Sequence, residues 1–238
     1  MQLIYTTKTW LKESQSPLAK VLMALINRVR FIEVPSISIL HKPLYWLHIS
    51  VMNSISNISR IMYWTPLFKS RLSSCGKRFY LYSAMPQVLG RLDIHIGNNT
   101  RMSGISTLCG RSSGDYMPQL IIGNNVDVGW QNSINVGRRI VIGDNVRLAG
   151  KVFLAGFPGH PLDAEKRAQG LAEEDHQVGD IVLENDVWLA TGVTVMAGVT
   201  IGAGTVVAAG SVVTHSLPSG VLAAGMPAIV IKVIGAKK

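Results

Sequence analysis

Aliphatic residues return at every sixth position near the end of the chain. They stand at Leu183, Leu189, Val195, Ile201, Val207 and Val213. A helix repeats near every 3.6 residues and a strand every two, so neither explains a period of six. Short strands joined by tight corners, one on each side of a prism, do explain it. The pattern is typical of a parallel β-helix of hexapeptide repeats, in which each coil buries its apolar residues against its neighbours.

The same period continues upstream, where insertions interrupt it. The earlier aliphatic positions are Ile96, Met102, Leu108, Ile122, Val128, Ile134, Ile142, Leu148 and Leu154. Grouped in threes, all these positions predict five coils of three strands each. Every insertion follows the third strand of a coil and so leaves the prism at one edge. The longest covers residues 156–180. We expect the chemistry there, because loops on a fixed scaffold tolerate length and carry function.

Two amphipathic helices are predicted before the repeats. Apolar residues recur at spacings of three and four over residues 17–34, and a second helix is predicted over residues 44–64. The second approaches the length of a membrane span, but its histidine, arginine, asparagines and serines argue against spanning. We therefore expect a mainly β protein with a basic helical region (1–90), a β-helix (91–220) containing the functional loop (156–180), and a C-terminal tail (221–238).

Positive charge is concentrated in the helical region. Residues 1–80 hold 11 basic and two acidic residues, which accounts for the whole net charge of +9. One hypothesis is that these helices pack on the first coil or on a neighbouring subunit and cover the open end of the β-helix. The other is that they lie on an anionic membrane surface, with their aromatic residues at headgroup level. The two are compatible. Nucleic acid is not expected, because the basic residues alternate with apolar ones.

Cysteine usage suggests a reducing compartment. Cys75 and Cys109 are too few for a disulfide framework, and the N-terminal residues show no secretory signal. We expect a cytoplasmic protein, peripheral on the inner face of the membrane if the helices bind lipid.

Four segments resemble the hexapeptide-repeat acyltransferases, on the branch of the galactoside, maltose and nodulation-factor O-acetyltransferases and the xenobiotic acetyltransferases. They are IGNNVDVGWQNSINVG, IGDNVRLAG, GHPLDAEKR and the stretch from NDVWLATG to AAGMPA, and they lie within residues 120–232. The resemblance implies a left-handed β-helix and transfer of an acetyl group from acetyl-CoA. It also implies a homotrimer with active sites between subunits, and no metal.

The family's catalytic base matches His160, in the GHP of the loop segment. A sugar hydroxyl is a poor nucleophile, and an imidazole that titrates near neutral pH can take its proton as it attacks a thioester. Gly159, Pro161 and the downstream Arg167 match the family at the same spacing. We assign Arg167 to acceptor binding.

The family lines its coenzyme A channel with small residues and backbone N–H groups. Such residues let an extended cofactor approach the wall, and the N–H groups can stabilise an oxyanion. A tryptophan beside the reacting centre, a tail on the adenine side and a basic residue for the phosphates complete the family's set. The matching positions here are Trp188, Thr191, Gly192, Ala209, Gly210, Gly225, Pro227 and Lys232.

Three positions depart from the family. His215 stands where a lysine is frequent, and Ile229 replaces a basic residue after the tail, so we expect weaker phosphate binding. The acceptor-contacting asparagine of galactoside-type members matches Gly129. We therefore expect a saccharide acceptor other than a simple galactoside. The candidate acceptor-binding residues in this coil are Asp127, Trp130, Gln131 and Asn132.

The function favoured by these features is O-acetylation of a sugar, in a cell-surface polysaccharide or a lipid-linked precursor. An N-acyltransferase acting on an amino-sugar nucleotide or a serine-type acceptor is the first alternative. A zinc enzyme resembling γ-carbonic anhydrase needs three converging histidines, and the six histidines here contain no suitable close pair on the coils. A non-catalytic scaffold is a further alternative, which the intact GHP loop disfavours.

Overall fold

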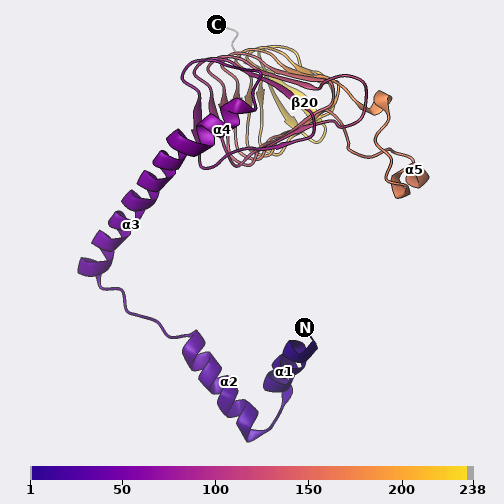
Figure 1. Cartoon of the computed structure of the whole chain (residues 1–238). Helices are drawn as coiled ribbons and strands as arrows, with labels where there is room; N and C mark the ends of the chain where they lie inside the picture. The colour runs from indigo at the N-terminus through magenta and orange to yellow at the C-terminus, as the bar shows by residue number, and fades with distance from the viewer. Residues whose placement is uncertain (1, 235–238) are drawn as a thin grey trace. The chain divides into compact units, whose positions relative to one another are not determined.

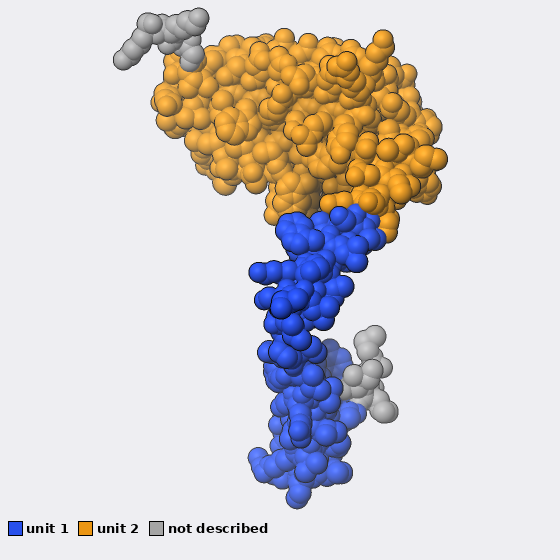
Figure 2. Space-filling model, turned by 90° about the vertical axis from the view of Figure 1, so that its left-hand side faces the viewer, with its two compact units in different colours: residues 1–52 blue, residues 53–238 orange. Residues whose placement is uncertain are grey.

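The computed structural model describes residues 2–234 and divides the chain into two compact units, residues 1–52 and 53–238 (Figures 1 and 2). The first unit contains α1 (Gln2–Glu13), α2 (Pro17–Arg30) and the beginning of α3 (Ser38–Ser59). The hydroxyl of Ser16 caps α2 by accepting a hydrogen bond from the N–H of Ala19, at 3.1 Å. Within residues 2–234, no helix combines the length and hydropathy that crossing a bilayer requires.

The second unit begins with helical structure that covers the first coil. A π-helical turn (Arg60–Trp64) and α4 (Thr65–Ser70) follow α3. Phe68 is 2% exposed and belongs to the same apolar core as the coils, with its ring 5.9 Å from that of Phe79. Packing of the helical region on the first coil is thereby confirmed for this segment.

Three stacks of parallel strands form the sides of the prism (Figure 1). Sheet A contains β1 (Ser74–Cys75), β4 (Asp93–Ile96), β7 (Gln119–Ile122), β10 (Arg139–Ile142), β13 (Ile181–Leu183) and β16 (Thr200–Ile201). Sheet B contains β2 (Tyr80–Tyr82), β5 (Arg101–Ser103), β8 (Asp127–Val128), β11 (Arg147–Leu148), β14 (Trp188–Leu189), β17 (Val206–Val207), β19 (Val221–Gly225) and β20 (Ala228–Val233). Sheet C contains β3 (Gln87–Leu89), β6 (Thr107–Gly110), β9 (Ser133–Val136), β12 (Phe153–Ala155), β15 (Thr194–Met196) and β18 (Val212–Val213).

The left-handed parallel β-helix is confirmed, with six coils instead of five. The aliphatic residues of the sixfold pattern point into the prism, and those from Leu183 to Val213 are fully buried. The additional coil, residues 74–89, lies in the part that we had assigned to the helical region. Its inward positions Cys75, Leu81 and Val88 are spaced by six and then seven residues, which breaks the period.

Part of the predicted C-terminal tail, residues 221–233, belongs to sheet B. β19 adds to sheet B beside β17 in parallel, and β20 folds back antiparallel on β19. Residues 221–233 therefore extend the β-helix as a hairpin.

Corner residues explain how strands this short can turn repeatedly. At the corner between sheets A and B, Asn99, Asn125, Asn145 and Asp186 adopt φ between 53° and 63°. Asparagine, aspartate and glycine tolerate this left-handed conformation better than other residues. The side chains also form a ladder between coils: the amide of Asn125 donates to Asn145 at 2.8 Å, and that of Asn145 to Asp186 at 2.9 Å.

Candidate active site

His160 lies in the long loop between β12 and β13, which leaves the prism at the edge between sheets C and A. Its side chain is exposed. A short helix, α5 (Ala164–Ala168), follows, and Asp163 caps it by accepting a hydrogen bond from the N–H of Lys166 at 2.9 Å. Arg167 folds back and donates to the carbonyls of Pro161 and Leu162 at 2.9 and 2.8 Å. Arg167 therefore braces the segment that carries His160, whereas the role predicted for Arg167 is acceptor binding.

A buried ion pair anchors the other half of the loop. Arg111, 3% exposed, donates from Nε to the carboxylate of Glu173, which is 6% exposed, and from Nη2 to the Glu173 carbonyl at 3.0 Å. Nη1 of Arg111 donates to Asp175 at 2.7 Å and to the hydroxyl of Tyr116. The hydroxyl of Ser113 donates to the carboxylate of Glu173 at 2.8 Å. The insertion at residues 111–118 and the loop at 156–180 are thus tied together.

The pKa values of this pair follow from the balance between burial and hydrogen bonding. Burial acts against the charge of Arg111, but its bonds to Asp175, Glu173 and Tyr116 raise the pKa of the guanidinium. Burial also acts to raise the pKa of Glu173, but the bonds from Arg111 and Ser113 outweigh it and lower that pKa below its ordinary value. Both groups are therefore charged at neutral pH.

A pocket of about 400 Å³ separates the two tied segments. We call it the loop pocket. It is lined by Cys109, Gly110, Ser112, Ser113, Phe157, Gly159, Ala172 and Glu173. Gly159 forms part of its wall, and His160 is the next residue along the chain. Arg111 and Glu173 could not be predicted as partners, because 62 residues separate them and neither belongs to a motif.

The predicted cofactor residues gather at a different edge, the corner between sheets B and C. The N–H of Gly192 donates to the carbonyl of Gly150 at 3.0 Å, and that of Gly210 donates to the carbonyl of Thr191 at 2.9 Å. These two N–H groups serve the ladder between coils and are not available to an oxyanion. Thr191 and Ala209 are exposed, and no hydrogen bond from their N–H groups is recorded among residues 2–234. The N–H groups of Thr191 and Ala209 are therefore the better candidates for stabilising an oxyanion.

The remaining cofactor candidates lie on sheet B and its terminal hairpin. Trp188 is 50% exposed on the outer face of β14, in register with Arg147 and Val206. Gly225 and Pro227 are exposed at the turn between β19 and β20, and Lys232 is exposed on β20. All four positions belong to sheet B or to the turn of its terminal hairpin.

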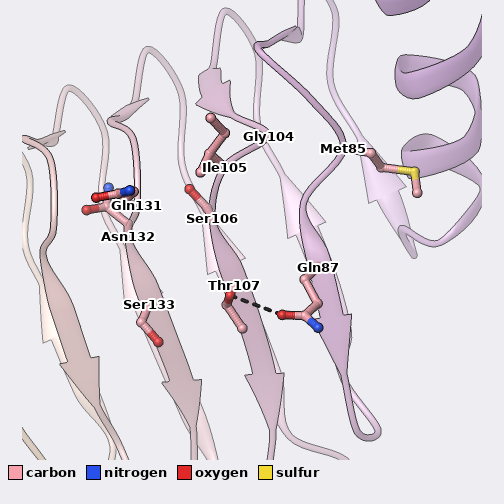
Figure 3. Close-up of a pocket in the computed structure, with 9 residues that line it drawn as sticks. All are labelled: Met85, Gln87, Gly104, Ile105, Ser106, Thr107, Gln131, Asn132 and Ser133. Carbon is pink, nitrogen blue, oxygen red and sulfur yellow. Dashed lines mark hydrogen bonds between the residues drawn. The ribbon is translucent and has the colours of Figure 1, made fainter. Parts of the chain in front are cut away.

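The predicted acceptor residues separate into two groups. Asp127 lies on the outer face of sheet B, 3.9 Å from Arg101. Trp130 stands at the corner between sheets B and C, 50% exposed, with Nζ of Lys151 5.4 Å from its ring. Gln131 and Asn132 line a pocket of about 360 Å³ at this corner (Figure 3). We call it the corner pocket.

Asn132 is corrected by the structure. It is 2% exposed, its amide donates to the carbonyl of Gly129 at 3.1 Å, and its side-chain oxygen accepts from the N–H of Val152 at 2.7 Å. These bonds hold the corner together, so the side chain is not free to bind acceptor. Gln131 is exposed beside it and stays a candidate.

Within one chain, the structure does not bring His160 to the predicted cofactor residues. His160 leaves the prism between sheets C and A, whereas Thr191 and Ala209 lie between sheets B and C. The outer face of sheet C separates the two edges. No group of three or more histidine, cysteine, aspartate or glutamate side chains among residues 2–234 is arranged to hold a metal ion.

Comparison with known proteins agrees with this architecture. Residues 180–215 match the family described as bacterial transferase hexapeptide, six repeats. A Saccharomyces cerevisiae protein, named provisionally as an acetyltransferase, is 40% identical over 123 residues, or 52% of this chain and 60% of the relative. The galactoside O-acetyltransferase of Escherichia coli is 37% identical over 119 residues, or 50% of this chain and 56% of the relative. The chain thus spans little more than half the length of these relatives.

A solved structure shares the fold over a longer stretch. It is a variant of the N-acyltransferase AntD from Bacillus cereus, in complex with dTDP-4-amino-4,6-dideoxyglucose and coenzyme A, with a TM-score of 0.58 and 21% identity. The match covers 72% of this chain and 89% of that one. At this identity the likeness concerns the fold alone. The match over residues 180–215 and the two relatives show that the β-helical part of the chain is similar to hexapeptide-repeat acetyltransferases, among them a sugar O-acetyltransferase.

Proposed function

We propose that the protein transfers the acetyl group of acetyl-CoA to a hydroxyl of a saccharide. The observation that carries the proposal is the exposed His160, which follows Gly159 of the loop pocket on a loop braced internally by Arg167 and tied to residues 111–118 by the Arg111–Glu173 pair. A base held in this way is positioned to meet an acceptor hydroxyl with little loss of orientation.

The mechanism follows from the chemistry of a positioned imidazole. His160 accepts the proton of the acceptor hydroxyl while its oxygen attacks the thioester carbonyl. The carbon–oxygen bond forms, the tetrahedral adduct collapses, and the carbon–sulfur bond breaks. His160 then returns the proton to the departing sulfur. The N–H groups of Thr191 and Ala209 are placed to stabilise the negative charge on the carbonyl oxygen.

Acetyl-CoA fits the edge between sheets B and C. The small exposed residues Thr191 and Ala209 leave room for an extended chain, and Trp188 offers an apolar surface next to them. Lys232 and the turn at Gly225 and Pro227 extend this surface toward the nucleotide end. Since His160 lies on another edge, we infer that a second subunit of a homotrimer completes each site.

The test is release of coenzyme A thiol in the presence of saccharides. We expect His160→Ala to lower kcat by a factor of about 100 or more, as loss of a general base does, with unchanged affinity for acetyl-CoA. His176→Ala is the matched control, because His176 lies exposed in the same loop. Equal rates for both variants would contradict the mechanism. Faster transfer to an amine than to any hydroxyl would favour the N-acyltransferase alternative.

We also propose that the first unit places the enzyme on the cytoplasmic face of a membrane, where lipid-linked glycan precursors are available. In α2, six apolar residues are between 36% and 65% exposed, namely Leu18, Val21, Leu22, Leu25, Ile26 and Val29. The helix carries Lys20, Arg28 and Arg30 and no acidic residue. A basic helix with an exposed apolar stripe is suited to an anionic surface.

Flotation of the full chain with vesicles tests this placement. We expect it to float with vesicles containing anionic lipid, and Leu25→Glu with Ile26→Glu to abolish flotation. Leu171→Glu, which alters an exposed leucine of the β-helix unit, should leave it unchanged. Absence of flotation in the wild type would exclude the membrane role but not the transferase activity.

A further inference from the structure

The outer face of sheet C differs chemically from the faces of the other two sheets. Its outward positions in register are Gln87, Thr107, Ser133, Phe153, Thr194 and Val212, followed by a second row of Leu89, Cys109, Asn135, Ala155 and Met196. None of these residues is charged. By contrast, the outer face of sheet B carries Arg101, Asp127 and Arg147, and that of sheet A carries Asp93 and Arg139.

The two pockets described above each border this face, at its two edges. Thr107 lines the corner pocket (Figure 3). Cys109 lines the loop pocket, and both residues belong to strand β6. Leu108 between them points into the core and is fully buried. Two residues of a strand span about 7 Å. The pockets are therefore neighbours along one strand, with the polar side chains of the face between them.

The lining of the pockets indicates the class of ligand. The corner pocket is lined by the amides of Gln87 and Gln131, the hydroxyls of Thr107 and Ser133, and the exposed apolar side chain of Ile105 (Figure 3). Such groups donate and accept hydrogen bonds without charge, and they match a ring that carries several hydroxyls.

The loop pocket has the same neutral character. It offers the hydroxyl of Ser112 and the ring of Phe157, and its carboxylate, Glu173, is neutralised by Arg111. None of the side chains that line either pocket is a free cation that could hold a phosphate. Both hollows therefore suit uncharged, hydroxyl-rich groups better than a nucleotide.

We propose that the outer face of sheet C binds a neutral saccharide of at least two rings. The reacting ring occupies the loop pocket beside His160, and the next ring occupies the corner pocket against Gln87, Thr107 and Gln131. The inference rests on the proposed acetyl transfer for the identity of the reacting ring. The two-ring requirement rests on the spacing and lining of the pockets alone.

Cys109 provides a direct measure of occupancy. It lines the loop pocket, whereas the other thiol, Cys75, lies on sheet A, and both are half-buried. In Cys75→Ser protein, alkylation of Cys109 by N-ethylmaleimide is followed with glucose and maltose, galactose and lactose, and N-acetylglucosamine and chitobiose. We expect one disaccharide to protect at concentrations about tenfold lower than its monosaccharide, which corresponds to about 1.4 kcal/mol.

Matched variants locate each ring. Cys109→Ser protein, in which Cys75 reports, should show no protection by any sugar. Gln87→Ala should remove the advantage of the disaccharide and leave the weak protection by the monosaccharide, while Phe157→Ala should weaken both. Gln119→Ala, on the outer face of sheet A, should change neither. Thermal unfolding of each variant checks that the fold is kept.

The outcomes separate this inference from the proposed activity. Equal protection by mono- and disaccharides, or no protection by any of the six sugars, overturns the two-ring site even if acetyl transfer to a sugar is detected. Protection of Cys109 by a disaccharide without release of coenzyme A thiol leaves the binding site standing and contradicts the acetyltransferase.

Discussion

Arg111 and Glu173 are the residues on which the position of the functional loop depends. Both lie below the surface, and their charges are satisfied by each other, by Asp175 and by Ser113. The pair fixes the end of the loop, while Arg167 fixes the part next to His160. The position of His160 therefore depends on residues outside the GHP segment.

The first prediction concerns removal of one partner. Glu173→Gln leaves the guanidinium of Arg111 buried against a neutral amide, and breaking a buried pair costs about 3–5 kcal/mol. We expect a cost of about 3 kcal/mol, because Asp175 still offsets part of the charge of Arg111. Hydrogen exchange should rise across residues 156–180 and 111–118, and acetyl transfer should fall. Glu165→Gln, an exposed glutamate of α5, is the control. Unchanged exchange in Glu173→Gln would show that the pair does not hold the loop.

A second prediction concerns pH. Because the pKa of Glu173 is lowered in the folded protein, its ionised form stabilises the loop fully above its ordinary value of 4.5. This stabilisation is lost as the pH falls through the lowered value. Asp175, whose pKa is lowered chiefly by its bond to Arg111, acts in the same direction. The protection of the loop amides, corrected for the intrinsic pH dependence of exchange, should therefore decrease as the pH falls from 5 to 3 in the wild type, and the decrease should be smaller in Glu173→Gln.

Sequence and structure differ at this scale for a definite reason. His160 is recognisable because its neighbours lie beside it in the chain. The contact between Arg111 and Glu173 joins two insertions and exists only after both leave the same edge of the prism. Asn132 was misassigned because an amide in a predicted acceptor coil gives no sign that both of its polar atoms bond to the corner.

At the scale of the strand and corner, the hexapeptide period predicts the β-helix well. Each repeat buries its aliphatic residue wherever the spacing of six is kept. The first coil was not predicted, because Leu81 and Val88 are seven residues apart and this spacing breaks the period of six. The hairpin of β19 and β20 was not predicted, because it follows the last hexapeptide repeat and its strands pair antiparallel.

A third prediction tests the corners. Asn145 has a φ of 61° and joins the ladder between Asn125 and Asp186. Asn145→Val places a branched side chain in the left-handed region, at about 1–2 kcal/mol, and removes two hydrogen bonds of about 1 kcal/mol each. Asn145→Gly removes only the bonds. The free energy of unfolding measured in urea should therefore be highest for the wild type, lower for Asn145→Gly and lowest for Asn145→Val. An equal loss of unfolding free energy in both variants would show that the left-handed backbone conformation at residue 145 does not affect stability.

At the scale of the molecule, the location of His160 and of Ala209 on different edges predicts complementation between subunits. His160→Ala and Ala209→Trp should each be inactive, the second because the bulky ring blocks the cofactor edge. In a random mixture within a trimer, about a quarter of the sites combine an intact His160 from one subunit with an intact Ala209 from another. Activity should return to that level after co-expression. No recovery would place both residues of a site in one chain.

The division of charge along the chain predicted two differently built regions, and the structure also has two units. Their boundary falls inside α3 and not where the charge changes, because residues 60–70 pack on the first coil while still helical. Composition can show that a segment is basic and amphipathic. It cannot show where such a segment stops contacting the core.

The insertions at 111–118 and 156–180 both depart after a strand of sheet C and return at the next strand of sheet A in unbroken register. The pairing of the strands is consequently independent of the length and sequence of the insertions. The two insertions and the ion pair that joins them can therefore change in length and sequence together while the register of the strands on either side is kept.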